Sequence, residues 1–229
     1  MGELALGSSP GVRSAVPEQV VILCPMSVER SAIAKALARA SLGTAKVIQT
    51  GIGAGAIVSA AKVHAGAAAL ILAGVAGGLR EVADVPPLGA IVDERGAAYD
   101  DFLGRVAGGV TLVGVDRIVD TPAAKLALAH STGASIVDME SHAFAACCRS
   151  LGVRWGVVRG VSDTPSETLP AEILAWITPQ GNTRVVRAVC DMALSPSHIP
   201  HIMRFARRSQ RVLPQVGDRV VELVRSLAH

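Results

Sequence analysis

The stretch "ASIVDMESHAFAACCRSLGVRWGVVRGVSD" (residues 134–163) decides the fold class. It opens with a β-branched run at 134–138, continues with an alanine-rich segment at 141–151, and closes with a valine-rich run at 154–161. The two outer runs predict strands and the middle segment predicts a helix. Strands that alternate with helices favour a largely parallel sheet wrapped by helices, so the chain is expected to be an α/β protein.

The same alternation extends from this stretch toward both ends of the chain. It predicts one domain over residues 20–229, with a central, mostly parallel mixed sheet surrounded by helices. Residues 1–19 are mainly small or polar and contain proline, so we expect a flexible tail there. Further strands are predicted at 20–24, 46–50, 69–73, 89–94 and 110–115. Further helices are predicted at 27–40, after the segment 51–56 as far as about residue 65, and at 122–130, 171–177, 183–194, 199–213 and 216–228.

Composition limits the classes of partner. Aromatic residues make up only 3% of the 229 residues and no nucleic-acid-binding motif is present, so we expect no nucleic acid partner. The net charge is +3, and eight arginines lie between Arg184 and the C-terminus. This cluster is explained either by a solvated helical face or by a surface that approaches an anionic membrane or acidic partners.

Cysteine spacing and hydropathy indicate the cellular setting. Cys24, Cys147, Cys148 and Cys190 have no metal-ligand spacing, so no metal or cofactor is expected. No apolar run is long enough to span a bilayer, and no secretory signal stands near the start. We therefore expect a reduced, cytoplasmic protein with no transmembrane segment.

Polar residues follow several of the predicted strands. Glu29, Glu140, Ser162 and Asp163 each come shortly after a strand, and the glycine-rich segment 74–79 predicts a turn after the most buried one. Ligands of open α/β sheets bind outside the carboxyl ends of the strands. We therefore expect these residues to meet at one rim of the sheet.

Each of these features also has a purely structural explanation. Glu29 in a first helical turn is favoured by the helix dipole, a turn aspartate commonly caps a helix, and glycines commonly serve turns. The segment "GIGAGA" (51–56) matches a dinucleotide-binding pattern, but the next predicted strand lacks the acid that would bind the ribose. A tight strand–helix turn is therefore favoured there. The residues alone identify a candidate site but no reaction.

Four separated segments carry a family resemblance: "VVILCPMSVERSAI" (20–33), "TGIGAGAIVSA" (50–60), "LAGVAGGL" (72–79) and "VDMESHAFAACCRSLGVRWGVVRGVSD" (137–163). Together they resemble the nucleoside phosphorylase and nucleosidase superfamily, and in particular its 5′-methylthioadenosine/S-adenosylhomocysteine nucleosidases. The resemblance implies an enzyme that hydrolyses the N-glycosidic bond of an adenine or other purine nucleoside and releases the free base.

The resemblance also implies a role for each residue of the candidate site. Glu140 would hydrogen-bond the ribose hydroxyls, with Met139 packing against the sugar. Asp163 would protonate or hydrogen-bond the purine ring nitrogen, a proton transfer that typically contributes about 10²–10⁴-fold to the rate. Glu29 would orient and deprotonate the attacking water, and Arg159 would lie near that acid. The other substrate-binding positions implied are Ser162, Gly74, Val75, Ala76, Gly77 and Ile118, the last as a base-stacking side chain.

The resemblance favours hydrolysis over phosphorolysis. Phosphorolytic relatives hold phosphate with an arginine just ahead of the glycine turn, where this chain has Leu72 and Ala73. Glu29 would repel phosphate and activate water. Val75 departs from the nucleosidases, which often have serine there. Two alternatives stay open: a phosphate-dependent purine nucleoside phosphorylase, and a non-catalytic nucleoside- or lipid-binding protein.

Two further segments bear on the substrate. The chain between 93–101 and 110–116 is shorter than in the methylthioadenosine enzymes, which is expected to open the pocket around the 5′ end of the substrate. The tail at 194–213 is similar to that of hopanoid-associated relatives. The resemblance therefore implies a small-molecule nucleoside, either methylthioadenosine/S-adenosylhomocysteine or an adenosylated hopanoid, and a homodimer, as is common among the relatives.

Overall fold

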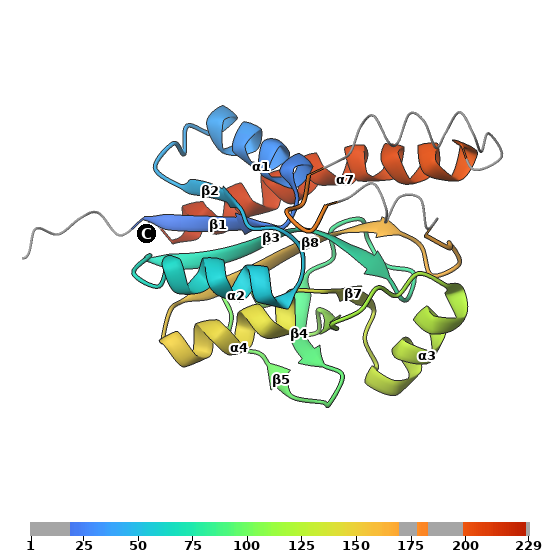
Figure 1. Ribbon diagram of the computed structural model, residues 1–229. Coiled ribbons are helices and arrows are strands. Elements are labelled where there is room, and N and C mark those ends of the chain that lie inside the picture. The colour runs from blue at the N-terminus through green and yellow to red at the C-terminus, as the bar shows by residue number, and fades with distance from the viewer. Residues whose placement is uncertain (1–18, 170–177, 183–198, 228–229) are drawn as a thin grey trace, which may run out of the picture.

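The computed structural model describes residues 19–169, 178–182 and 199–227. A mixed eight-stranded sheet with helices on both faces forms the core, which confirms the expected α/β class (Figure 1). The strands are β1 (Val20–Cys24), β2 (Lys46–Gln49), β3 (Ala69–Gly78), β4 (Leu88–Asp93), β5 (Ala98–Tyr99), β6 (Val110–Gly114), β7 (Ile136–Asp138) and β8 (Trp155–Asp163). The helices are α1 (Ser27–Arg39), α2 (Ala54–Val63), α3 (Pro122–Thr132), α4 (Ser141–Leu151) and α7 (Ile199–Ser226).

The sheet is organised around β3. Strands follow the order β2–β1–β3–β7–β6–β4–β5, and β8 also pairs with β3. Most pairs are parallel, whereas β7 runs antiparallel to β3 and β5 antiparallel to β4. The strands β7 and β8 flank α4 in sequence but do not pair with each other. Each pairs with β3, β7 in the antiparallel and β8 in the parallel direction. β3 and β8 are almost entirely buried, which explains the continuous apolar sequence of β3, whereas β8 also buries Arg159, Ser162 and Asp163.

Two helical layers cover the sheet, and alternate residues of β1 contact each of them. Val21 and Leu23 belong to a cluster that contains residues of α2 and α4, such as Ile57. Ile22 and Cys24 belong to a cluster that contains residues of α1 and α7. Figure 1 shows α1 and α7 on one face of the sheet and α2 and α4 on the other. The side-chain period of two in a strand produces this division.

The glycine-rich segment 74–79 corrects one prediction. We expected a turn after residue 73, but β3 continues to Gly78 and pairs with β8 along most of this length. The glycines permit close approach rather than a turn. A Cβ on Gly78 would lie 2.5 Å from the backbone oxygen of Asp163, so a larger residue would separate the two strands.

The C-terminal helix corrects a second prediction. We expected two helices with a break near Pro214, but α7 runs unbroken from 199 to 226. Val212, Val216 and Val220 are fully buried against the sheet, and this packing outweighs the backbone hydrogen bond that proline removes. The tail predicted at 1–19, apart from residue 19, and the helices predicted at 171–177 and 183–194 lie outside the described residues. In the part of the chain that is described, no helix is long and apolar enough to cross a membrane.

Candidate active site

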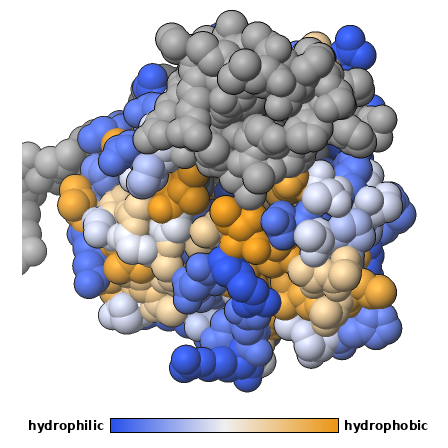
Figure 2. Space-filling model, turned by 45° about the vertical axis from the view of Figure 1, so that its right-hand side comes forward, coloured by the Kyte–Doolittle hydropathy of each residue, from blue (hydrophilic) through white to orange (hydrophobic). Residues whose placement is uncertain are grey.

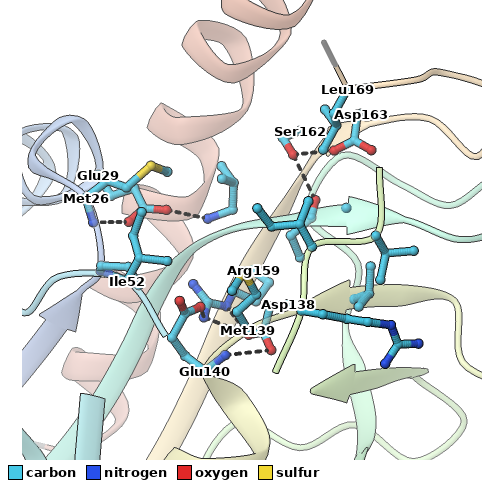
Figure 3. Close-up of a pocket in the computed structure, with 18 of the residues that line it drawn as sticks. Met26, Glu29, Ile52, Asp138, Met139, Glu140, Arg159, Ser162, Asp163 and Leu169 are labelled. Carbon is cyan, nitrogen blue, oxygen red and sulfur yellow. Dashed lines mark hydrogen bonds and ion pairs between the residues drawn. The ribbon is translucent and has the colours of Figure 1, made fainter. Parts of the chain in front are cut away.

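A cavity of about 450 Å³ lies where β1, β7 and β8 end and the glycine segment of β3 passes between them. Every predicted site residue except Gly74 lines this cavity, and Gly74 borders it between Glu29 and Arg159. Figure 3 shows Glu29, Glu140 and Asp163 on different sides of it. The lining comprises Pro25, Met26, Glu29, Ile52, Val75, Ala76, Gly77, Arg117, Ile118, Val119, Val137, Asp138, Met139, Glu140, Arg159, Ser162, Asp163, Leu169, Thr178 and Pro179.

Glu29 links the start of α1 to β3. Its Oε2 accepts a hydrogen bond from the backbone N–H of Met26 at 2.8 Å, and its Oε1 accepts one from the N–H of Val75 at 2.8 Å. The carboxyl group is 1% exposed, and this burial raises its pKa to about 7 despite the nearby guanidinium of Arg159. A Cβ on Gly74 would lie 2.6 Å from the carboxyl carbon of Glu29, so only glycine fits beside it.

Asp138 and Glu140 share the guanidinium of Arg159. Nε of Arg159 donates to Oδ2 of Asp138 at 2.7 Å, and Nη2 donates to Oε2 of Glu140 at 3.0 Å. Oδ1 of Asp138 accepts from the backbone N–H and the hydroxyl of Ser141, at 3.0 and 2.6 Å, and so fixes the start of α4. Oε1 of Glu140 accepts from the N–H of Gly53 at 2.8 Å. Both acids line the cavity, and Asp138 also braces the strand–helix junction.

Arg159 is the central cation of this cluster. It is 1% exposed, and among the described residues its Nη1 has no hydrogen-bond partner. This nitrogen lies on the Gly74 side, next to Glu29. Three carboxylates around one guanidinium leave an excess of negative charge, and burial raises the pKa of Glu140 as well as that of Glu29. The site thus has an unused donor beside a carboxyl group that gains a proton easily.

Asp163 ends β8 on the opposite side of the cavity. The carboxylate is buried, and its Oδ1 accepts a hydrogen bond from the hydroxyl of Ser162 at 2.7 Å. Its Oδ2 accepts one from Nζ of Lys125 on α3. Sequence reasoning missed Lys125, because a lysine in the alanine-rich segment 122–130 is indistinguishable from a solvent-facing one. Only the packing of α3 against the chain after β8 buries it.

Apolar side chains form most of the remaining wall. Met139 is half-buried, and Ile118, at 45% exposed, contributes its side chain to the wall near Val119. The segment 178–182 was not expected at the site. The carbonyl of Pro179 accepts from the N–H of Ile52 at 2.9 Å, which holds this segment against the loop after β2.

Comparisons with known proteins identify the family of the chain. The family described as "Phosphorylase superfamily" matches residues 88–221, which is more than half of the chain. Futalosine hydrolase from Thermus thermophilus is 38% identical over 85 residues, which are 37% of this chain and 35% of that protein. The match thus spans about a third of the length of this curated relative.

Solved structures share the fold across nearly the whole chain. Futalosine hydrolase of Helicobacter pylori has a TM-score of 0.59 and 14% identity, covering 92% of this chain and 97% of its own. A putative 5′-methylthioadenosine/S-adenosylhomocysteine nucleosidase from Francisella philomiragia has a TM-score of 0.59 and 17% identity, covering 90% and 98%. The fold of these neighbours and the family match over residues 88–221 confirm the resemblance drawn from the sequence: the chain belongs to the phosphorylase superfamily.

Proposed function

We propose that the protein is a nucleosidase that hydrolyses the N-glycosidic bond of a purine nucleoside carrying a 5′ substituent. The observation that carries this proposal is the meeting of three buried carboxyl groups, those of Glu29, Glu140 and Asp163, at one cavity. They come from distant parts of the chain. Cleavage develops positive charge on the sugar and negative charge on the base, and carboxyl groups on both sides can serve both needs.

Each acid has a distinct task in the proposed reaction. Glu140 binds the ribose hydroxyls, with Met139 against the sugar. The bond between the sugar carbon C1′ and the base nitrogen breaks, its electron pair stays with the base, and Asp163 gives a proton to a ring nitrogen. Glu29 takes a proton from the water that attacks C1′. The free Nη1 of Arg159 beside Glu29 offers a second contact for this water.

The charge of the cavity favours water over phosphate as the nucleophile. Arg159 is shared by Asp138 and Glu140, and Arg117 is paired with Glu94. Both arginines that line the cavity within the described residues are thus paired with acids, so a phosphate anion next to Glu29 would find no unshared cation among them. Phosphorolysis remains the alternative, and a non-catalytic nucleoside- or lipid-binding protein is the alternative of another class.

The wall supports an apolar 5′ substituent. Figure 2 shows hydrophobic residues gathered near the middle of one face of the molecule. Met26, Ile52 and Pro179 are among the apolar residues of the lining. We propose a thioether nucleoside or an adenosylated hopanoid as substrate. Futalosine, the substrate named for two similar proteins, belongs in the same test panel.

We further propose a cytoplasmic homodimer in which α7 approaches an anionic membrane. On α7, Arg207 is exposed and Arg211 has a side-chain exposure of 64%. A lipid-borne nucleoside would have to be reached at such a surface. Cosedimentation with anionic and neutral vesicles, and sedimentation velocity, test these two points.

The test of the function is an assay for free base. Nucleosides with different 5′ groups are incubated with the protein, with and without phosphate. We expect base release that needs no phosphate and falls about 10²–10⁴-fold in Asp163→Asn, while the fold is retained. Formation of ribose 1-phosphate would favour the phosphorylase, and tight nucleoside binding without release would favour the non-catalytic protein.

A further inference from the structure

Lys125 is a fully buried lysine that the proposed reaction does not yet use. Its side chain is 0% exposed, and a buried ammonium is unfavourable unless charge and hydrogen bonds compensate it. Nζ donates to Oδ2 of Asp163, to the carbonyl of Thr164 at 2.8 Å and to the carbonyl of Glu167 at 2.8 Å. Three donors thus have three acceptors, which holds the ammonium in one position.

Lys125 lies behind Asp163 as seen from the cavity. Ser162 and Asp163 line the cavity, whereas Lys125 does not. The lysine contacts Oδ2, and the hydroxyl of Ser162 contacts Oδ1. Lys125 therefore meets the cavity lining at the carboxyl group of Asp163, while its other two bonds hold the backbone at Thr164 and Glu167.

The hydroxyl of Ser162 can serve both protonation states of Asp163. It lies 2.7 Å from Oδ1 of Asp163 and 3.1 Å from the carbonyl oxygen of Ala76. It can donate to Oδ1 when Asp163 is a carboxylate. When Asp163 is protonated at Oδ1, the hydroxyl can donate to Ala76 instead, which leaves the acid proton free to reach the base. After the proton transfer the hydroxyl can donate to Oδ1 again.

We propose that Lys125 is a positioning residue for Asp163 during base release, a role that rests on the proposed nucleosidase function. Its ammonium anchors Oδ2, so the rotation of the carboxyl group toward the base is fixed. Once the proton of Asp163 has moved to the ring nitrogen and the electron pair of the broken bond has gone to the base, the ammonium compensates the carboxylate that remains. Loss of the cation should slow this step and leave nucleoside binding nearly unchanged.

The test is a double-mutant cycle on base release with Lys125→Met and Asp163→Asn. Methionine keeps the apolar stem and removes the charge. We expect Lys125→Met to lower kcat at least about tenfold, a part of what general acid catalysis supplies, with KM changed less than about threefold. In the Asp163→Asn protein, measured in single turnovers, the same substitution should add less than about threefold, because Lys125 then has no acid to act through.

Two further variants separate charge from stability. Thr121→Ala is the matched control, because Thr121 caps α3 by accepting from the N–H of Ala124 at 3.3 Å and is not bonded to Asp163. It should lower the melting temperature and leave kcat within about twofold. If Lys125→Met does not fold, Lys125→Gln removes the charge but keeps an N–H donor for the carbonyl of Thr164 or Glu167, and the same loss of kcat is expected.

Two results overturn the inference. One is a folded Lys125→Met or Lys125→Gln protein with wild-type kcat. The other is an equal loss of the rate of base release when Lys125 is replaced in the wild type and in Asp163→Asn, which would mark a purely structural lysine. Wild-type turnover distinguishes these failures from failure of the proposed function. If the wild type releases no base from any nucleoside, the proposed function fails and the role of Lys125 falls with it.

Discussion

At the scale of single residues, the buried site contains more acidic than basic side chains. Glu29, Asp138 and Glu140 surround Arg159, and all four side chains are nearly inaccessible to water. Burial raises the pKa of Glu29 to about 7, so this carboxyl group exchanges its proton near neutral pH. Such a group suits a general base, since it can be ionised before the reaction and protonated after it.

Activity is expected to rise with pH through the pKa of Glu29. A carboxylate that deprotonates water must be ionised, and burial raises the pKa of Glu29 to about 7. Below that pH, kcat/KM should fall about tenfold per pH unit, as a single ionisation requires. A pH–rate profile, with a melting curve at each pH, measures this. Glu29→Gln should be nearly inactive at every pH, and a wild-type rate that stays flat down to pH about 5 would contradict the assigned role.

Glu29 also makes the stability of the fold depend on pH. Its pKa is raised from 4.5 to about 7 in the folded protein, so the folded state holds the proton more tightly. This contribution is fully present below pH 4.5 and is lost as pH rises through about 7, an effect of about 3 kcal/mol. Glu29→Gln removes the titration. The free energy of unfolding of the wild type, measured with urea, should therefore lose this contribution between pH about 5 and about 8. The difference between the two pH values should be smaller by about 2 kcal/mol in Glu29→Gln than in the wild type.

At the scale of elements, the glycines of β3 allow helix α1 to bring its acid to the cavity. Glu29 stands at the third position of α1, and its carboxyl group rests against Gly74, where no side chain intervenes. The same strand gives the N–H of Val75 to that carboxyl group. A strand with ordinary side chains at these positions would keep α1 and its acid away from the site.

Gly74→Ala is therefore expected to impair the reaction more than the fold. The added Cβ would lie 2.6 Å from the carboxyl carbon of Glu29 and 2.7 Å from Nη1 of Arg159, so the acid has to move. Displacement by about 1 Å can cost about 100-fold in rate, and we expect kcat/KM to fall by about that factor. Gly55→Ala in α2 is the control, because nothing lies within 4 Å of its Cβ. It should keep full activity and stabilise the protein by up to about 1 kcal/mol.

At the scale of the whole molecule, the site is built on the most deeply buried strands. β3 and β8 lie between two helical layers and supply Val75, Arg159 and Asp163 to the cavity. Elements that bring the other acids, α1 and β7, pack on or pair with β3. The distances within the site are thus held by the core of the protein.

Hydrogen exchange should be slower in the central strands of the sheet than in the strands at its ends. The backbone amides of β3 and β8 are expected to exchange only on global unfolding, since both strands are buried along their length. Those of β2 and β5, at the two ends of the sheet order, should exchange through smaller openings. Exchange measured by mass spectrometry, with and without a bound nucleoside, checks this. Protection of β5 equal to that of β3 would contradict it.

The sequence determined most of the elements, and the residues predicted from the family resemblance, apart from Gly74, line one cavity. Strand and helix periodicities follow from local burial, so six strands were predicted close to their observed bounds, and β3 was predicted to end at 73 rather than at Gly78. Two predictions failed because a local rule was outweighed. The glycines after residue 73 stay in β3 because β8 and β7 pair with them, and Pro214 stays inside α7 because a stripe of valines packs against the sheet.

Only the tertiary structure decided how the charges of the site are paired. Lys125 reaches Asp163 across 38 positions of sequence, Arg159 joins Asp138 to Glu140, and the segment 178–182 docks on the loop after β2. Periodicity reports whether a residue faces the core or the solvent, but it carries no record of which distant side chain it meets there. Ion pairs and pKa values depend on that meeting and on the loss of water around it, which only the folded chain defines.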